Sequence, residues 1–142
     1  MANFLTAPQQ KISAILAGMI RQPIIAIGAL FGAVSVALGA FGAHVLKDSL
    51  SPYAFSVFQL AAQYMILHAL TLLAVGLLYD RYKNPLLPKV ALAFSLGIVF
   101  FSGSLLLIAF TGVTAFGAIA PIGGSLLIVG WLGLAWTAFR GA

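Results

Sequence analysis

The sequence contains no cysteine and no glutamate, and its only acidic residues are Asp48 and Asp80. The lack of cysteine excludes disulfides, thiolate metal ligands and cysteine nucleophiles. Charged residues make up only 6% of the 142 residues, against about 25% in an average soluble domain. Carboxylate pairs for acid–base catalysis and phosphate-binding glycine motifs are also missing, so we expect no enzymatic activity.

What the sequence has instead is long apolar runs, since 63% of its residues are hydrophobic. A helix needs about 20 mostly apolar residues to cross a bilayer, and four blocks reach this length. The blocks are Pro23–Leu46, Pro52–Tyr79, Pro88–Phe110 and Pro121–Phe139. They are too long for strands, and each opens with a proline, which suits the first helical position. Because the connections are short, the sequence predicts an all-α membrane protein, a four-transmembrane-helix up-down-up-down bundle.

Lysine and arginine fall mainly at one end of this predicted bundle. That end holds Lys11, Arg21, Arg81, Lys83, Lys89 and Arg140, and the other end holds Lys47 alone. Because positively charged flanks face the cytoplasm, we expect a multi-pass membrane protein with both termini on the cytoplasmic side, or on its equivalent in an organelle. The cations form no basic face, so the formal charge of +5 does not indicate nucleic-acid binding.

Residues 1–22 differ from the four-helix transmembrane domain, residues 23–142. Apolar residues recur there at helical spacing between Lys11 and Arg21, namely Ile12, Ile15, Leu16, Met19 and Ile20. This pattern fits a short amphipathic helix in the membrane interface, and a loose tail is the alternative.

Small residues mark the expected helix contacts, because close backbone approach drives helix association in lipid. The first block carries the stripe Gly28, Gly32, Ser35, Gly39 and Gly42, and the fourth a weaker one at Gly123, Gly130 and Thr137. Ile27, Leu30, Phe31, Val34, Leu38 and Phe41 then face lipid. A third face of the first block holds Ala26, Ala33, Ala37, Ala40 and His44.

Polar residues inside apolar helices are candidate functional positions. They are His44, Gln59, Gln63, Tyr64 and His68, and three alternatives apply: interhelical hydrogen bonds, a polar path for a proton or solute, or a partner contact. At the outer interface, His44 can cap the helix or sense pH. At about 1.5 Å per residue the two histidines differ in depth by about 15–20 Å, so we expect no metal or other cofactor.

Several runs resemble the YgdD/YwdK family of small membrane proteins of unknown function. They are Gly39-Ala-Phe-Gly-Ala-His44, Tyr64-Met-Ile-Leu-His68, Phe101-Ser-Gly-Ser104, Pro121-Ile-Gly-Gly124 and Gly130-Trp131. The resemblance covers residues 24–136 and implies four spans in an inner membrane, but no activity. Ala120 and Leu106 stand where the family often has hydroxyl-bearing residues.

Two functional hypotheses follow. The first is a non-catalytic membrane protein that acts by contact, as an accessory subunit or a membrane-stabilising protein. Its partners would be membrane lipids and other membrane subunits or a second copy. The alternative is a small transporter or proton-handling channel lined by Gln63, Tyr64 and His68.

Overall fold

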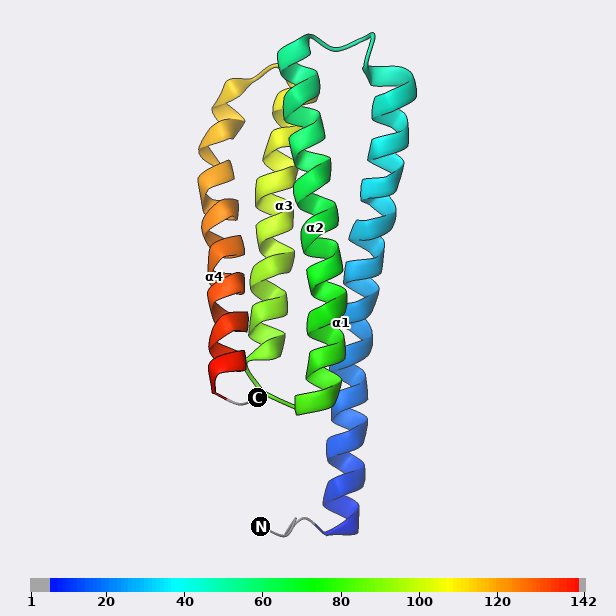
Figure 1. Cartoon of the computed structure of the whole chain (residues 1–142), viewed down its shortest axis with the longest axis vertical. Helices are drawn as coiled ribbons and strands as arrows, with labels where there is room; N and C mark the ends of the chain where they lie inside the picture. Colours follow the sequence, from blue (N-terminus) through cyan, green and yellow to red (C-terminus); the bar gives the residue numbers. More distant parts are fainter. Residues whose placement is uncertain (1–5, 141–142) are drawn as a thin grey trace.

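The computed structural model describes residues 6–140, apart from the side chains of Ala17, Gly18 and residues 20–22. The elements are α1 (Ala7–Phe41), the π-helical turn η1 (Gly42–Leu46), α2 (Pro52–Tyr82), α3 (Leu87–Thr111), the 3₁₀ turn η2 (Thr114–Ala118) and α4 (Ala120–Phe139). Consecutive helices run antiparallel, and α1 begins at the end of the bundle where α4 ends (Figure 1). The predicted all-α up-down-up-down architecture is confirmed.

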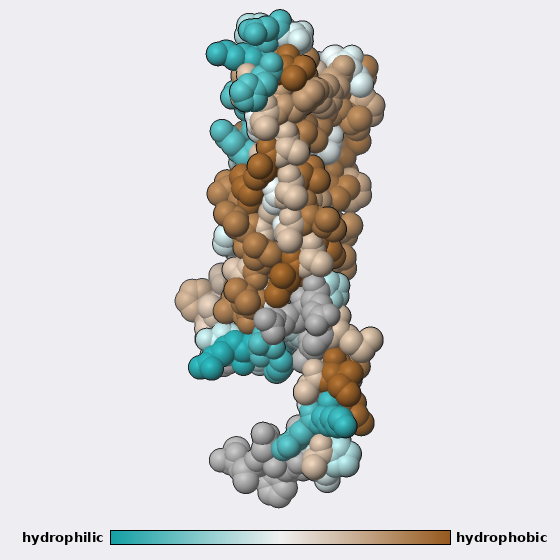
Figure 2. Space-filling view, turned by 90° about the vertical axis from the view of Figure 1, so that its right-hand side faces the viewer, coloured by the Kyte–Doolittle hydropathy of each residue, from teal (hydrophilic) through white to brown (hydrophobic). Residues whose placement is uncertain are grey.

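Four helical segments of the described chain are long and apolar enough to cross a membrane. They are Pro23–Leu46, Pro52–Tyr82, Leu87–Thr111 and Thr114–Phe139, which match the predicted blocks closely. Hydrophobic residues cover most of the bundle's length, and hydrophilic residues gather at its ends (Figure 2). The chain is therefore a multi-pass membrane protein.

The helices form an open arrangement in which α2 and α3 are central. Consecutive helices pack closely, whereas α1 touches α3 only slightly. Between α1 and α4, and between α2 and α4, no pair of described Cα atoms comes within 8 Å. The most apolar stretches of α2 and α3 are accordingly 39% buried, against 17% in the spans of α1 and α4. The two outer helices thus leave most of their surface for lipid or partners.

The helix starts follow local sequence signals, with one correction. Ser51 caps α2 as its hydroxyl accepts a hydrogen bond from the Ala54 N–H at 3.2 Å. Pro23, however, lies inside α1 rather than at its first position. The helix starts at Ala7, where the Gln9 side chain accepts the Thr6 N–H at 3.0 Å and Pro8 occupies the first turn.

Residues 7–22 form the first part of α1 and extend past the other helices (Figure 1). Their placement in the membrane interface stays a prediction, and residues 1–5 lie outside the described part of the chain.

The contact between α1 and α2 uses every second member of the predicted small-residue stripe. A Cβ added at Gly28 would lie 3.0 Å from the Ala69 carbonyl oxygen, and one at Gly42 would lie 2.7 Å from the Phe58 ring. Between them, the Ser35 hydroxyl donates a hydrogen bond to the Ala62 carbonyl at 2.8 Å. These three residues sit seven apart, which keeps them on one line along the helix.

The structure corrects the prediction at Gly32 and Gly39, because a Cβ at either position would meet nothing within 4 Å. It also corrects Phe31 and Leu38, which pack partly buried against the core instead of facing lipid. The contact face of α1 is thus rotated toward these two larger side chains. They fill the volume beside the glycine line that small residues alone would leave empty.

The predicted small residues of α4 lie against α3. A Cβ at Gly130 would lie 2.8 Å from the Phe94 ring, and a Cβ at Gly123 would overlap the Phe101 backbone. Thr137 is also buried. Gly97 of α3 is equally close to Leu127 of α4. Glycines on both helices therefore allow close approach, as expected where helices associate in lipid.

Candidate functional site

The polar residues of α2 are divided between two cavities on different sides of this helix. The α1–α2 cavity, of about 410 Å³, is lined by Gly39, Gly42, Ala43, Lys47, Phe55, Phe58, Gln59, Ala62 and Gln63. The α2–α4 cavity, of about 430 Å³, is lined by Tyr64, Leu67, His68, Thr71, Phe101, Gly124, Leu127, Ile128 and Trp131. The structure therefore does not bring Gln63 and His68 into one continuous site.

His68 is 5% exposed and is held by a hydrogen bond on each ring nitrogen. Its Nδ1 lies 2.7 Å from the Tyr64 carbonyl oxygen, and its Nε2 lies 3.2 Å from Nε1 of Trp131. A carbonyl oxygen can only accept, and an indole N–H can only donate. Nδ1 must therefore carry the proton and Nε2 the lone pair, so this arrangement holds the neutral ring in one tautomer.

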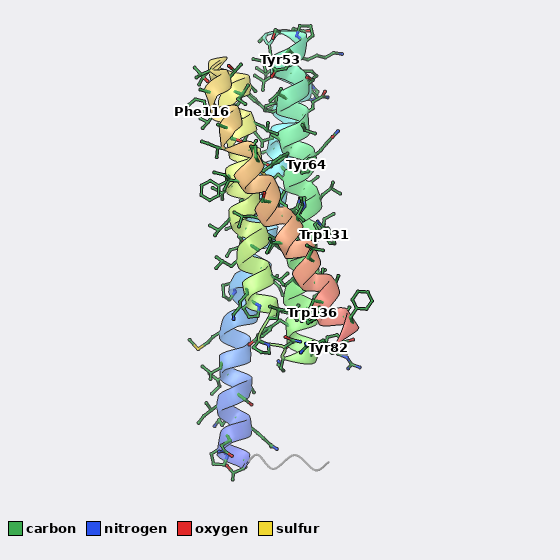
Figure 3. All side chains as sticks on the ribbon, turned by 90° about the vertical axis from the view of Figure 1, so that its left-hand side faces the viewer. Tyr53, Tyr64, Tyr82, Phe116, Trp131 and Trp136 are labelled. Carbon is green, nitrogen blue, oxygen red and sulfur yellow. The ribbon has the colours of Figure 1, made fainter. Side chains whose placement is uncertain are left out.

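Aromatic rings enclose His68 on the side of α3 and α4. Its ring centroid lies 5.7 Å from that of Phe94 and 6.1 Å from that of Trp131. Tyr64, one turn away, packs against Phe101 at 4.5 Å. Figure 3 shows Tyr64 and Trp131 on the face where α4 crosses the other helices. These aromatic contacts and the hydrogen bond from Trp131 give His68 a structural role in joining α2 to α4. The Cα atoms of these two helices stay more than 8 Å apart in the described chain.

Gln59 and Gln63 are exposed on α2, and within residues 6–140 neither amide has a hydrogen-bond partner. The 31-residue α2 is about 46 Å long, close to the full bilayer thickness of about 40–45 Å. Gln59 lies about 10 Å from the start of the helix and Gln63 about 16 Å. An amide without a partner costs about 4–8 kcal/mol in a hydrocarbon. Both amides therefore need partners from outside the described chain.

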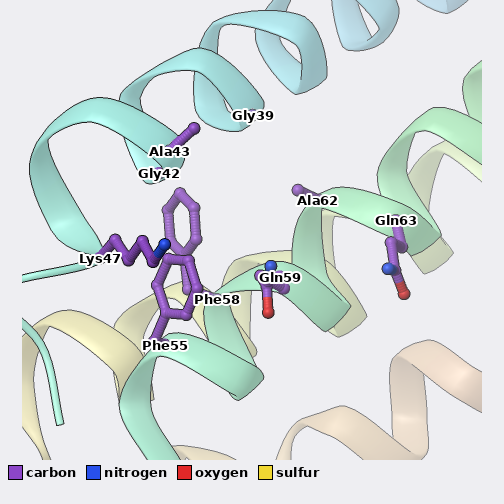
Figure 4. A pocket seen from close by; sticks show the side chains of 9 residues that line it. All are labelled: Gly39, Gly42, Ala43, Lys47, Phe55, Phe58, Gln59, Ala62 and Gln63. Carbon is purple, nitrogen blue, oxygen red and sulfur yellow. The ribbon is translucent and has the colours of Figure 1, made fainter. Parts of the chain in front are cut away.

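Lys47 lies over the α1–α2 cavity because of the π-helical turn η1. The Lys47 N–H donates to the Gly42 carbonyl at 3.1 Å, five residues earlier. This bond places Lys47 about one turn above Gly42 on the same side of the helix, where an α-helix would place residue 46. In Figure 4 its side chain extends toward Phe55 and Phe58. Nothing in the sequence indicated this turn.

His44 lies in the same π-helical turn but lines neither cavity. It is exposed, and its ring makes no hydrogen bond with the part of the chain that the structure describes. The predicted helix cap is therefore not formed by this side chain. Likewise, no three His, Asp or Glu side chains in the described residues are placed to hold a metal ion.

Trp131 is the residue of this region that sequence reasoning missed. It is separated from His68 by 63 positions, so no local pattern links the two. The runs that carried the family resemblance do meet here, since they supply Tyr64, His68, Phe101, Gly124 and Trp131 to one cavity. The available signal was that one of these runs contains an indole N–H donor, Trp131, and another contains a histidine, His68.

Comparison with known proteins assigns the family. Residues 38–124 match the model described as "Protein of unknown function (DUF423)". A UPF0382 membrane protein of Staphylococcus saprophyticus is 44% identical over 116 residues, covering 82% of this chain and 96% of the relative. YwdK of Bacillus subtilis is 38% identical over 111 residues, with 76% and 89% covered. A UPF0382 membrane protein of Haemophilus influenzae is 38% identical over 112 residues, with 79% and 90% covered.

No solved structure matches the chain. The family match covers more than half of the sequence, and the relatives align over most of their own length. Together with the four apolar helices, these matches agree with the resemblance seen in the sequence. The chain belongs to the DUF423 family of unknown function, and it is a relative of the UPF0382 membrane proteins.

Proposed function

We propose that this protein is non-catalytic and acts by contact with another membrane-embedded chain, as an accessory subunit or as a homo-oligomer. The observation that carries the proposal is the uncovered alanine face of α1, formed by Ala26, Ala33, Ala37, Ala40 and His44. Every one of these side chains is exposed. Small residues are what membrane helices use to approach one another closely.

The packing of α1 supports this proposal. Its line of Gly28, Ser35 and Gly42 is already used against α2, so the alanine face lies on a different side. The span of α1 is only 17% buried within the chain. A helix with small residues on two sides has room for a second helical neighbour, and the described chain provides none on the alanine face.

The placement of the two carboxylates also fits a non-catalytic role. Asp48 follows η1 at one end of the bundle, whereas Asp80 lies near the end of α2 and pairs with Lys83 at 3.1 Å. General acid–base catalysis needs such groups within hydrogen-bond reach of one substrate. Neither carboxylate lines either cavity.

Cross-linking tests the contact, because the chain has no native cysteine. Ala33→Cys places a thiol on the alanine face, and Val34→Cys places one at the same depth about 100° around the helix. We expect a thiol-specific cross-linker to join Ala33→Cys chains in membranes to a second chain, and Val34→Cys chains much less. Equal yields, together with a monomer mass and no co-purifying protein in mild detergent, would reject the proposal.

The transporter hypothesis has weaker support. Gln63 and His68 lie in separate cavities, and both ring nitrogens of His68 are occupied. A proton or solute path along α2 would need these groups to be connected. Flux measured in reconstituted vesicles decides the matter. Flux that falls in both His68→Ala and Gln63→Ala would favour transport over the contact role.

A further inference from the structure

We propose that the α1–α2 cavity binds one glycerophospholipid from the leaflet at the end of the bundle away from the termini. Its phosphate pairs with Lys47, and an ester carbonyl accepts a hydrogen bond from Gln59. One acyl chain starts between Gly39 and Phe58 and runs inward past Ala62. This inference does not depend on the proposed function, because the cavity and the alanine face lie on different sides of α1.

Charge complementarity places the phosphate. Lys47 is the one lysine or arginine at this end of the bundle in the described chain, and its ammonium makes no ion pair there. The π-helical turn places this side chain over the cavity (Figure 4). The phosphate is the anion that a bilayer presents at this depth. Asp48, the next residue, is exposed and does not line the cavity.

The amide of Gln59 matches an ester group below the phosphate. Gln59 lies about 10 Å below the start of α2, close to the boundary between the headgroup region and the hydrocarbon, where the ester groups lie. Ester carbonyls can only accept hydrogen bonds, and an amide NH₂ offers two donors. A lipid ester therefore supplies a partner that Gln59 lacks in the described chain.

The shape of the cavity suits a hydrocarbon chain. Gly39 leaves a hollow on α1, because a Cβ there would meet nothing within 4 Å. The facing wall is apolar and rigid, formed by the stacked rings of Phe55 and Phe58 with centroids 6.5 Å apart, and by Ala62. At about 410 Å³ the cavity accommodates part of one acyl chain.

Native mass spectrometry of the purified full chain tests the site, with phosphatidylglycerol titrated into the detergent. We expect one tightly retained phosphatidylglycerol per chain. Lys47→Gln removes the cation and should weaken retention about tenfold, the effect of losing a charge-assisted hydrogen bond. Diacylglycerol with the same acyl chains should bind the native protein about as weakly. Soluble glycerol phosphate should not bind, which distinguishes a lipid from a free phosphate.

Two glycine variants test the geometry with a matched control. Gly39→Leu fills the hollow and should abolish retention, whereas Gly32→Leu enters equally open space outside the cavity and should leave it unchanged. If Gly39→Leu does not fold by circular dichroism, Gln59→Leu replaces it and should lower retention severalfold. Equal retention by the native protein, Lys47→Gln and the folded cavity variant would overturn the proposal. So would equal loss in Gly32→Leu, or a lipid-free dimer.

Failure of the lipid site and failure of the contact role give different results. Cross-linking at Ala33 reports on the alanine face and does not use the cavity. Lipid retention that depends on Lys47 can therefore stand when cross-linking fails, and the reverse also holds.

Discussion

Trp131 of α4 donates its indole N–H to Nε2 of His68 in α2 at 3.2 Å, joining two helices whose Cα atoms stay more than 8 Å apart in the described chain. The bond fixes where the imidazole proton resides, since the other nitrogen faces the Tyr64 carbonyl. His68, a candidate functional residue in the sequence, therefore connects α2 to α4 in the structure. Its consequences are open to direct measurement.

Loss of this bond should cost stability. Trp131→Phe keeps an aromatic ring in the α2–α4 cavity but removes the donor, so we expect a loss of about 0.6–2 kcal/mol. Unfolding in mixed micelles with increasing SDS measures the change. In the native protein, nitrogen-15 NMR should show His68 protonated at Nδ1 only. A resonance from a proton on Nε2 would contradict the structure.

The two kinds of glycine should respond oppositely to alanine. Gly123→Ala places a methyl group into the Phe101 backbone and should destabilise the protein by about 1–3 kcal/mol through overpacking. Gly32→Ala meets open space and should raise stability by up to about 1 kcal/mol, because alanine favours the helix. The same SDS titration compares them. Similar losses in both variants would show that Gly32 is covered by a helix after all.

Two buried serines also form a matched pair. Ser102 is 0% exposed, and its hydroxyl has no hydrogen-bond partner among the described residues, whereas Ser35 donates to Ala62 on the neighbouring helix. Ser102→Ala should therefore be neutral or stabilising by about 1 kcal/mol. Ser35→Ala should lose about 0.6–2 kcal/mol. A destabilised Ser102→Ala would reveal a partner for that hydroxyl, such as a buried water.

Orientation in the membrane follows from the positive flanks and can be tested with single cysteines. Ser49→Cys lies between η1 and α2, and Pro85→Cys lies between α2 and α3. Because the lysines and arginines gather at the Pro85 end, that end should face the cytoplasm. In intact bacterial cells a membrane-impermeant maleimide should label Ser49→Cys only, and both after permeabilisation. The reverse labelling would invert the predicted topology.

The sequence by itself determined that this is a four-span helical membrane protein and where its spans lie. Those properties depend on hydropathy and on contacts a few residues apart, which are local in the chain. Small residues also indicated which helices can approach closely, since any two membrane helices need them. Even so, the same pattern placed Gly32 and Gly39 in a contact that they do not make.

Only the tertiary structure decided which face each helix turns to its neighbour. The rotation of α1 is set by how Phe31 and Leu38 fill the space beside α2 and α3, and this depends on side chains far away in sequence. The π-helical turn that brings Lys47 over its cavity and the pairing of His68 with Trp131 have the same origin. The helical period fixes the angle between residues around one helix. Packing against other helices decides which of those residues face a neighbouring helix.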